Sequence, residues 1–175
     1  MKIQSSQVKE LRDQTGAGIL ACKKALEKTG GDLEEAIDIL RAEGIAKAAK
    51  REGREAREGV IRMKISDDGT KAALLELNCE TDFVARTDDF SALADELVGI
   101  LFEKGPDALE EKTVRDKITA AAATIGEKID IGRTLFWEKE GYIGGYLHHN
   151  NRLGVLVELS TQMGELARQM AMQIA

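Results

Sequence analysis

Aromatic residues and histidine are scarce in this chain of 175 residues. Aromatics make up 4% of the sequence, and the two histidines, His148 and His149, are adjacent. Any core must therefore be aliphatic. Neighbouring strand residues point to opposite faces, so we expect His149 to face away from whatever His148 touches. No zinc-binding, nucleophile-elbow or phosphate-loop pattern occurs. The sequence thus predicts no metal site and no cofactor, and an enzyme is the less favoured class.

Cysteine and long apolar runs are equally rare. Cys22 and Cys79 are too few for a disulfide framework. No apolar run approaches the roughly 18 residues of a membrane span, and residues 1–6 lack the apolar core of a signal peptide. The net charge of −6 argues against direct binding of nucleic acid. We therefore expect a soluble protein without a membrane partner, in the bacterial cytoplasm or an organellar matrix.

The first 45 residues predict a compact three-helix domain. A helix over 6–14 is followed by the glycine-containing turn Thr15–Gly18 and by a helix over 19–28, which would bury Ile19 or Leu20 together with Cys22, Ala25 and Leu26. Asp32 begins the third helix with a capping-box arrangement, and Gly44 is its expected stop. So small a domain suits docking better than catalysis.

Residues 46–58 form a charged segment. They hold five basic and three acidic residues and, apart from alanine, almost nothing apolar. The composition indicates a solvated, partly helical linker. A basic stretch that contacts RNA is the alternative, which the interleaved glutamates weaken.

From Gly59 onward the pattern predicts strands. Residues 60–65 and 72–77 form a hairpin around the dipeptide Asp68–Gly69. Apolar helices are expected over 89–103 and from Pro106 to Gly126. The strand 133–138 would join the hairpin in a three-stranded antiparallel sheet.

An internal repeat relates the two halves of this region. With an offset of 82 residues, 59–77 align with 141–159 and five of the 19 positions are identical. Both copies predict a hairpin followed by an apolar helix. The fold class is therefore α+β, with domains over 1–45, 59–140 and 141–175, the last apparently incomplete, and the linker over 46–58.

The first copy alone carries a polar loop, residues 78–90, after its second strand. Phe83 in this loop has two interpretations: it packs under the following helix as core, or it protrudes and enters a partner's pocket beside Asp82. Cys79 is expected to be a small buried residue, since no base is at hand to activate it.

The chain resembles the translation elongation factor Ts family over nearly all of its length. The matching segments are 8–12, 15–19, 22–26, 31–36, 47–50, 78–86, 125–129 and 152–157, together with His148. The segment from Asn78 to Arg86 is the family's most specific signature. The resemblance implies an N-terminal domain like the ubiquitin-associated (UBA) fold, followed by a core of two related hairpin-plus-helix subdomains.

The resemblance also implies a non-enzymatic guanine nucleotide exchange factor that binds elongation factor Tu with GDP or without nucleotide. GDP release would follow from disturbance of the magnesium and phosphate-loop region. The implied contacts form three groups. The exchange wedge comprises Thr81, Asp82, Phe83 and Val84; the core contact comprises Ile125 and His148; N-terminal docking involves Arg12, Thr15, Gly16, Ala17, Gly18 and Lys23.

The chain departs from the family pattern at its end, because many members continue past the position of Ala175 with a strand that completes the second subdomain. A truncated chain or association with a second copy is therefore expected. Two other functions stay open from the residues: a module that binds ubiquitin, suggested by the first three helices, and an enzyme that uses Cys79 and His148.

Overall fold

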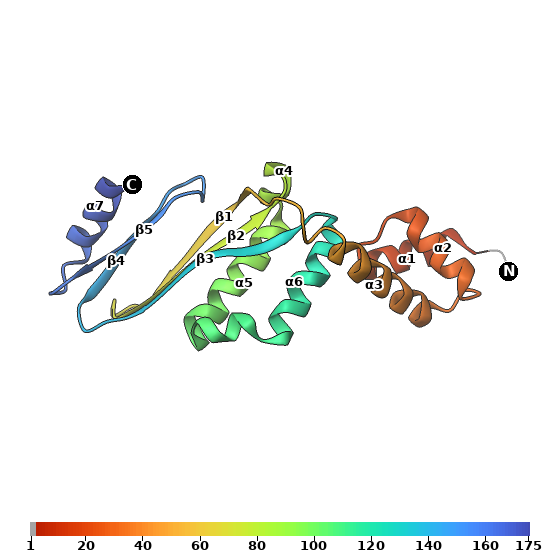
Figure 1. Ribbon diagram of the computed structural model, residues 1–175, viewed down its shortest axis with the longest axis horizontal. Helices are drawn as coiled ribbons and strands as arrows, with labels where there is room; N and C mark the ends of the chain where they lie inside the picture. The colour runs from red at the N-terminus through yellow and green to blue at the C-terminus, as the bar shows by residue number, and fades with distance from the viewer. Residues whose placement is uncertain (1–2) are drawn as a thin grey trace. The chain divides into compact units, whose positions relative to one another are not determined.

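The computed structural model describes residues 3–175, which divide into two compact units (Figure 1). The first unit comprises the chain up to Arg54 together with Lys117–Lys128, and the second comprises Glu55–Asp116 and Ile129–Ala175. Within the described residues, no helix combines the length and apolar character needed to cross a membrane. The division of the chain at residues 45, 58 and 140 stays a prediction.

The first unit is built on three helices, as predicted. They are α1 (Ser5–Thr15), α2 (Ile19–Lys28) and α3 (Leu33–Ala49). Gly16 ends α1 with φ of 65°, and the Asp32 carboxylate begins α3 by accepting a hydrogen bond of 2.9 Å from Glu35 N. The fully or almost fully buried core consists of Leu11, Cys22, Ala25, Leu26 and Ala36.

Gly44 does not stop α3, contrary to the prediction, and the helix continues to Ala49 through the first residues of the expected linker. A Cβ atom at position 44 would lie 2.8 Å from Ala123 Cβ in α6 (Lys112–Ile125). The missing side chain therefore allows the close approach of two helices. Arg51 Nη1 also donates to Ala122 O at 3.4 Å, so the part of α6 that belongs to this unit contacts both α3 and the residues just after it.

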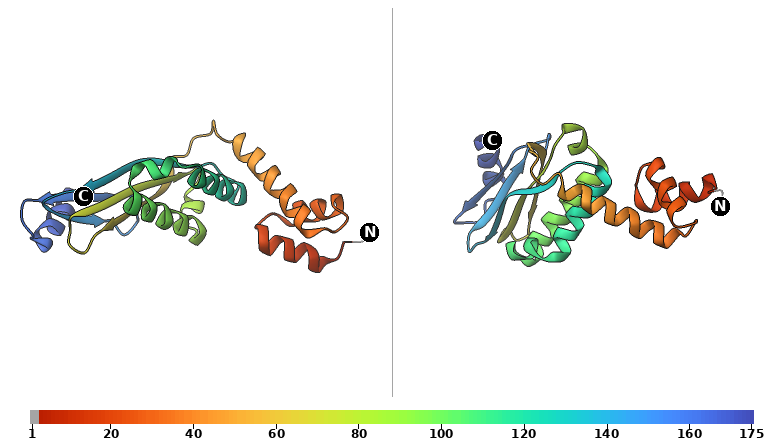
Figure 2. Two further views of the ribbon diagram at one scale, coloured as in Figure 1. Left: turned by 90° about the horizontal axis from the view of Figure 1, so that it is seen from below. Right: turned by 45° about the vertical axis from the view of Figure 1, so that its right-hand side comes forward.

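The second unit stacks its sheets and helices in layers (Figures 1 and 2). A three-stranded antiparallel sheet has the order β1-β2-β3, and a separate hairpin pairs β4 with β5. Helix α5 covers one face of the larger sheet, the β4–β5 hairpin lies on its other face, and α7 covers the hairpin. The strands are β1 (Glu58–Ile65), β2 (Lys71–Cys79), β3 (Ile129–Glu138), β4 (Tyr142–Leu147) and β5 (Gly154–Leu159); the helices are α4 (Asp82–Ala85), α5 (Asp88–Lys104) and α7 (Gly164–Ile174).

The predicted sheet is confirmed, with β3 beside β2 and extended to Ile129 at its start. Pro106 opens a 3-10 helix (Pro106–Glu110), and α6 begins only after it, at Lys112. Gly126 ends α6 as expected, with its N–H donating to Ala122 O at 3.0 Å.

The two hairpins repeat each other in register. Val60 pairs with Leu77 in the first hairpin, and Tyr142 pairs with Leu159, each 82 positions later, in the second. The two hairpins also exchange a pair of backbone hydrogen bonds, in which a strand residue of each donates to the turn of the other. Ile61 N donates to Asn151 O, and Ile143 N donates to Gly69 O, both at 2.6 Å. Because these bonds are related by the same offset, the internal repeat is a pseudo-two-fold arrangement of two hairpins.

Gly69 stands at a crowded point of this arrangement. Its φ is 70°, and a Cβ atom there would lie 2.4 Å from the Tyr142 ring. Gly69→Ala should therefore combine the left-handed backbone penalty with overpacking, and lower the free energy of unfolding by roughly 2–4 kcal/mol. Urea denaturation measures the loss. Asn151→Ala is the matched control, because its φ is 56° at the repeat-related position and it already carries a Cβ; it should lose only about 1 kcal/mol. Equal losses would contradict the crowding argument.

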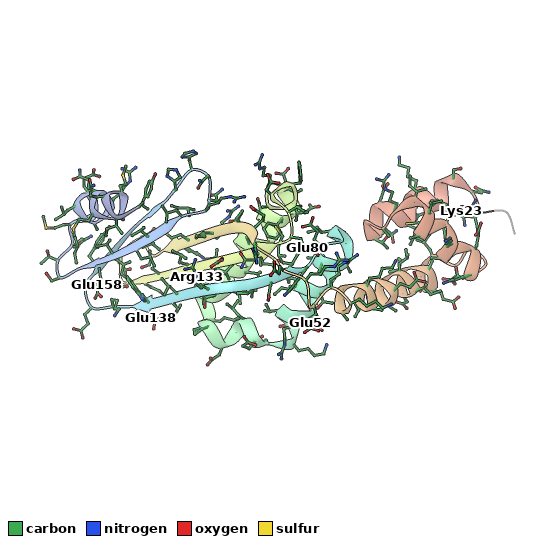
Figure 3. The ribbon with its side chains drawn as sticks, turned by 45° about the horizontal axis from the view of Figure 1, so that its top comes forward. Lys23, Glu52, Glu80, Arg133, Glu138 and Glu158 are labelled. Carbon is green, nitrogen blue, oxygen red and sulfur yellow. The ribbon has the colours of Figure 1, made fainter. Side chains whose placement is uncertain are left out.

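An ion pair ties β3 to β2 at an irregularity in their pairing between Leu75 and Leu77. Arg133 Nε lies 2.8 Å from Glu76 Oε2, and this hydrogen bond holds the pKa of the Glu76 carboxyl below its usual value. Figure 3 shows Arg133 on β3. A lowered carboxyl pKa in the folded state stabilises the protein above the unfolded pKa, and this contribution is lost as pH falls through the folded value.

Arg133→Met should therefore slightly reduce the free energy of unfolding at pH 7, and the effect should be small because the guanidinium is largely exposed. The difference from the parent should narrow as pH falls below roughly 4.5 and disappear at lower pH. Urea unfolding over a pH series measures it, with Arg41→Met as the control. Arg41 lies 3.9 Å from Asp38 on an exposed helix face. A difference that stays constant with pH would contradict the role of Glu76.

Candidate functional site

The loop after β2 is a short capped helix. Thr81 is the N-cap residue of α4, and its hydroxyl accepts a hydrogen bond from Val84 N at 3.4 Å. The last residue of β2, Cys79, is fully buried, and its thiol donates to Thr81 O at 3.2 Å. The polar loop of the first repeat copy is therefore an ordered projection from the end of β2.

Phe83 protrudes from this helix, with 80% of its surface exposed. The alternative that Phe83 packs under the following helix is wrong. The buried apolar side chains of this segment are instead those of Ala85 and Phe90, at 5% and 0% exposure. A four-residue helix has one buried side, and Ala85 occupies it, so the Phe83 ring is left in solvent.

Asp82 lies beside Phe83 with its charge already paired. Arg86 Nη2 donates to Asp82 Oδ2 at 2.7 Å, four residues along the chain. Thr81 and Val84 are half-buried. Of the four predicted wedge residues, Phe83 alone presents a large free apolar surface, and Asp82 and Arg86 form a polar edge next to it.

The β4–β5 turn lies at the same end of the sheet as this loop. Arg152 in the turn pairs with Glu58, and Asn151 O accepts the hydrogen bond from Ile61 N. Glu58 is the register partner of Cys79 in the first hairpin. The pseudo-two-fold arrangement therefore brings the turn that carries His148 to the end of β2 from which the Phe83 loop projects.

His148 and His149 do not point to opposite sides, contrary to the prediction. Strand β4 ends at Leu147, so both histidines belong to the turn, and their ring centroids are 4.2 Å apart. His148 Nδ1 also lies 2.8 Å from the Tyr146 hydroxyl. Within residues 3–175, no group of three or more His, Cys, Asp or Glu side chains is placed to hold a metal ion.

Cys79 is buried as predicted, with 0% exposure. A catalytic thiol must reach both a substrate and a base, and nucleophilic cysteines lie in partly exposed, electropositive surroundings. The position of Cys79 beneath the loop instead suits a structural residue.

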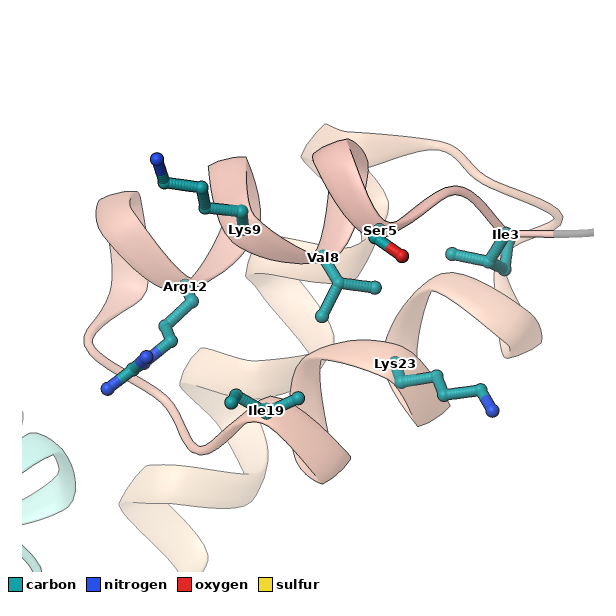
Figure 4. Close-up of a pocket in the computed structure, with 7 residues that line it drawn as sticks. All are labelled: Ile3, Ser5, Val8, Lys9, Arg12, Ile19 and Lys23. Carbon is teal, nitrogen blue, oxygen red and sulfur yellow. The ribbon is translucent and has the colours of Figure 1, made fainter.

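The first unit carries a surface hollow of about 430 Å³ between α1 and α2 (Figure 4). Ile3, Val8 and Ile19 supply its apolar surface, and three cationic side chains surround them. Those cationic residues are Lys9, Arg12 and Lys23. The structure thus brings two predicted docking residues, Arg12 and Lys23, to one hollow suited to an apolar segment with acidic flanks.

Ile19 and Leu20 are the docking candidates that sequence reasoning missed. We expected one of them to be buried, but they are 57% and 74% exposed. Cys22, Ala25 and Leu26 already fill the buried face of α2. The sequence did contain a signal for this exposure. The first turn of the short helix α2 carries two large aliphatic side chains in addition to the residues that already form its buried face.

Thr15 and Gly16, two other predicted docking residues, form contacts within the first unit. The Thr15 hydroxyl donates to Leu11 O at 2.6 Å. A Cβ atom on Gly16 would lie 2.6 Å from Thr124 Cγ2, so Gly16 packs closely against α6. Ile125, the last residue of α6, is half-buried and lies in the first unit. The structure therefore places Ile125 next to the residue that Gly16 contacts.

Comparison with known proteins gives a consistent result. A family model described as Elongation factor TS matches residues 80–175. Elongation factor Ts of Prosthecochloris aestuarii is 46% identical over 191 residues, covering 99% of this chain and 66% of the relative. Elongation factor Ts of Aquifex aeolicus is 43% identical, covering 100% and 68%, and that of Hydrogenovibrio crunogenus is 46% identical, covering 100% and 62%. The chain therefore spans about two thirds of the length of these relatives.

Proposed function

The chain belongs to the elongation factor Ts family, and we propose on that basis that it acts in translation elongation as a guanine nucleotide exchange factor. It would bind elongation factor Tu and promote the release of GDP without chemical catalysis. The observation that carries the mechanism is the exposure of Phe83, which at 80% is the most exposed large hydrophobic side chain in the described part of the chain.

Phe83 and Asp82 would act as a wedge at the nucleotide site of the partner. GDP in such a site is held by backbone N–H groups of a phosphate loop and by an oxygen-ligated magnesium ion. An aromatic side chain inserted beside them would displace the loop, and the Asp82–Arg86 pair would form a polar contact next to the ring. Binding of the factor and binding of GDP then weaken each other by the same factor.

The binding free energy that Phe83 can contribute shows whether the wedge alone could account for GDP release. A 1000-fold faster release needs about 4 kcal/mol of differential binding. Full burial of one Phe side chain contributes about 1.5–3 kcal/mol. The rest requires a broad interface, for which the turn with His148 and the basic-rimmed hollow of the first unit are the candidates. Ile19 and Leu20 would extend the apolar surface of that hollow.

Release of a fluorescent GDP analogue from elongation factor Tu tests the proposal. The native chain should accelerate release in a concentration-dependent manner, and added GDP should weaken its binding to the partner. A heat-unfolded sample of the same chain is the control. If the folded chain neither accelerates release nor binds the nucleotide-free partner, the proposed function is wrong.

A further inference from the structure

We propose that Thr87, which lies outside the predicted wedge, is the positioning residue that fixes the orientation of Phe83. The proposal rests on the proposed function, because it concerns the same projecting loop. Thr87 stands between α4 and α5, and its hydroxyl forms hydrogen bonds to both helices. It donates to Val84 O at 2.8 Å and accepts from Phe90 N at 3.4 Å. One side chain thereby links the end of one helix to the start of the next.

Helix α4 is too short to be stable on its own. Its four residues are far fewer than an isolated helix requires, because the first turn costs more conformational entropy than its few hydrogen bonds recover. The geometry of Phe83 must therefore be imposed from the ends of the helix. Thr81 caps the beginning. At the end, Val84 O accepts two hydrogen bonds from Thr87, one from its backbone N–H at 3.0 Å and one from its hydroxyl at 2.8 Å.

Helix α5 provides a rigid support for Thr87. Phe90, Leu97 and Leu101 on α5 are fully buried, and Thr87 is the N-cap residue of this helix. The bond from Phe90 N to the Thr87 hydroxyl therefore connects the loop to the core. The Thr87 hydroxyl thus joins Phe90 N on α5 to Val84 O on α4, and it reinforces the backbone bond from Thr87 N to Val84 O.

The consequence for function is preorganisation. A side chain that is already in its bound orientation loses less entropy when it enters a partner's pocket. Thr87 need not touch the partner to have this effect. Loss of its hydroxyl should therefore weaken binding while leaving unchanged the displacement that Phe83 causes once bound.

Two variants of Thr87 and one control variant test this. Thr87→Val keeps the shape and removes both hydrogen bonds of the hydroxyl but not the backbone bond to Val84 O, whereas Thr87→Ser keeps the hydroxyl. Thr70→Val is the matched control, because Thr70 is also exposed and its hydroxyl donates to Asp68 at 2.9 Å, but in the turn between β1 and β2. The first measurement is hydrogen exchange of the Ala85 and Arg86 amides, which needs no partner.

We expect Thr87→Val to speed exchange of these two amides about fivefold, the typical effect of losing a helix cap. In nucleotide release, it should raise the half-maximal concentration of the factor about fivefold and leave the maximal rate unchanged. Thr87→Ser should restore both values, and Thr70→Val should match the parent. In a Phe83→Ala background, Thr87→Val should have no further effect on release, because no oriented ring remains.

Several results would overturn the proposal. These are unchanged amide exchange in Thr87→Val, failure of Thr87→Ser to restore the parent values, or an undiminished effect of Thr87→Val in the Phe83→Ala background. The last result would show a general loss of structure. If the parent itself does not accelerate GDP release, the proposed function fails, and amide exchange alone then decides whether Thr87 fixes the loop.

Discussion

Phe83→Ala should reduce the acceleration of GDP release by roughly 10- to 150-fold at limiting concentrations of the factor. The range corresponds to the loss of about 1.5–3 kcal/mol when a fully buried Phe side chain is removed from an interface. The free protein should not be destabilised, since the ring is 80% exposed and its removal leaves no cavity. Stopped-flow release of a fluorescent GDP analogue measures the effect, and urea denaturation measures stability.

Met172→Ala is the matched control for this experiment. Met172 is also an exposed apolar side chain, at 45%, but it lies on α7. Its removal should leave both the release rate and the stability close to those of the parent. If Phe83→Ala stimulates release as well as the parent does, the ring is not the wedge, and the exposure of Phe83 has another cause.

Substitution of Phe90, seven residues later, should mainly reduce stability, in contrast to substitution of Phe83. Phe90→Ala should lower the free energy of unfolding by about 3–5 kcal/mol, because the side chain is fully buried against the sheet and a cavity would remain. This is a large part of the total stability of a typical domain, about 5–15 kcal/mol. The midpoint of urea unfolding should fall while its slope stays constant.

Phe90→Leu provides a second measurement if the alanine variant does not fold. It keeps most of the apolar volume and should lose less than half as much free energy. A loss below about 1 kcal/mol in Phe90→Ala would contradict the assignment of this ring to the core. The two phenylalanines therefore separate function from stability: Phe83 affects exchange and Phe90 affects folding.

Local patterns in the sequence were sufficient for most elements of the fold. Helix α2 runs from Ile19 to Lys28 as predicted, because glycines on both sides define its ends. The repeat offset of 82 residues was readable from a few identities, and it predicts the strand register. These features depend on residues close in sequence or on comparison of the chain with itself.

The errors and the open alternatives arose where packing or the exact end of an element decides the outcome. Gly44 is an ordinary stop signal by its local sequence, yet it faces Ala123, 79 positions later. Phe83 had two interpretations, and its exposure of 80%, beside the fully buried Phe90, decides between them. The histidine pair was assigned to a strand that ends one residue earlier, at Leu147. Tertiary contacts and element boundaries are the information that local patterns do not contain.

The reciprocal bonds between the hairpins have a consequence for synthesis of the chain. Ile61 and Asn151 are separated by 90 positions, so β1 emerges from a ribosome well before its partner turn exists. At about 5–20 residues per second, the delay is roughly 5–18 seconds. During that time the apolar side chains of Ile61, Met63 and Leu74 are not yet covered by β4 and β5. In the folded protein these side chains pack against Gly145 of β4 and Gly154 of β5. The nascent first hairpin is therefore an expected client for chaperones that bind exposed apolar strands.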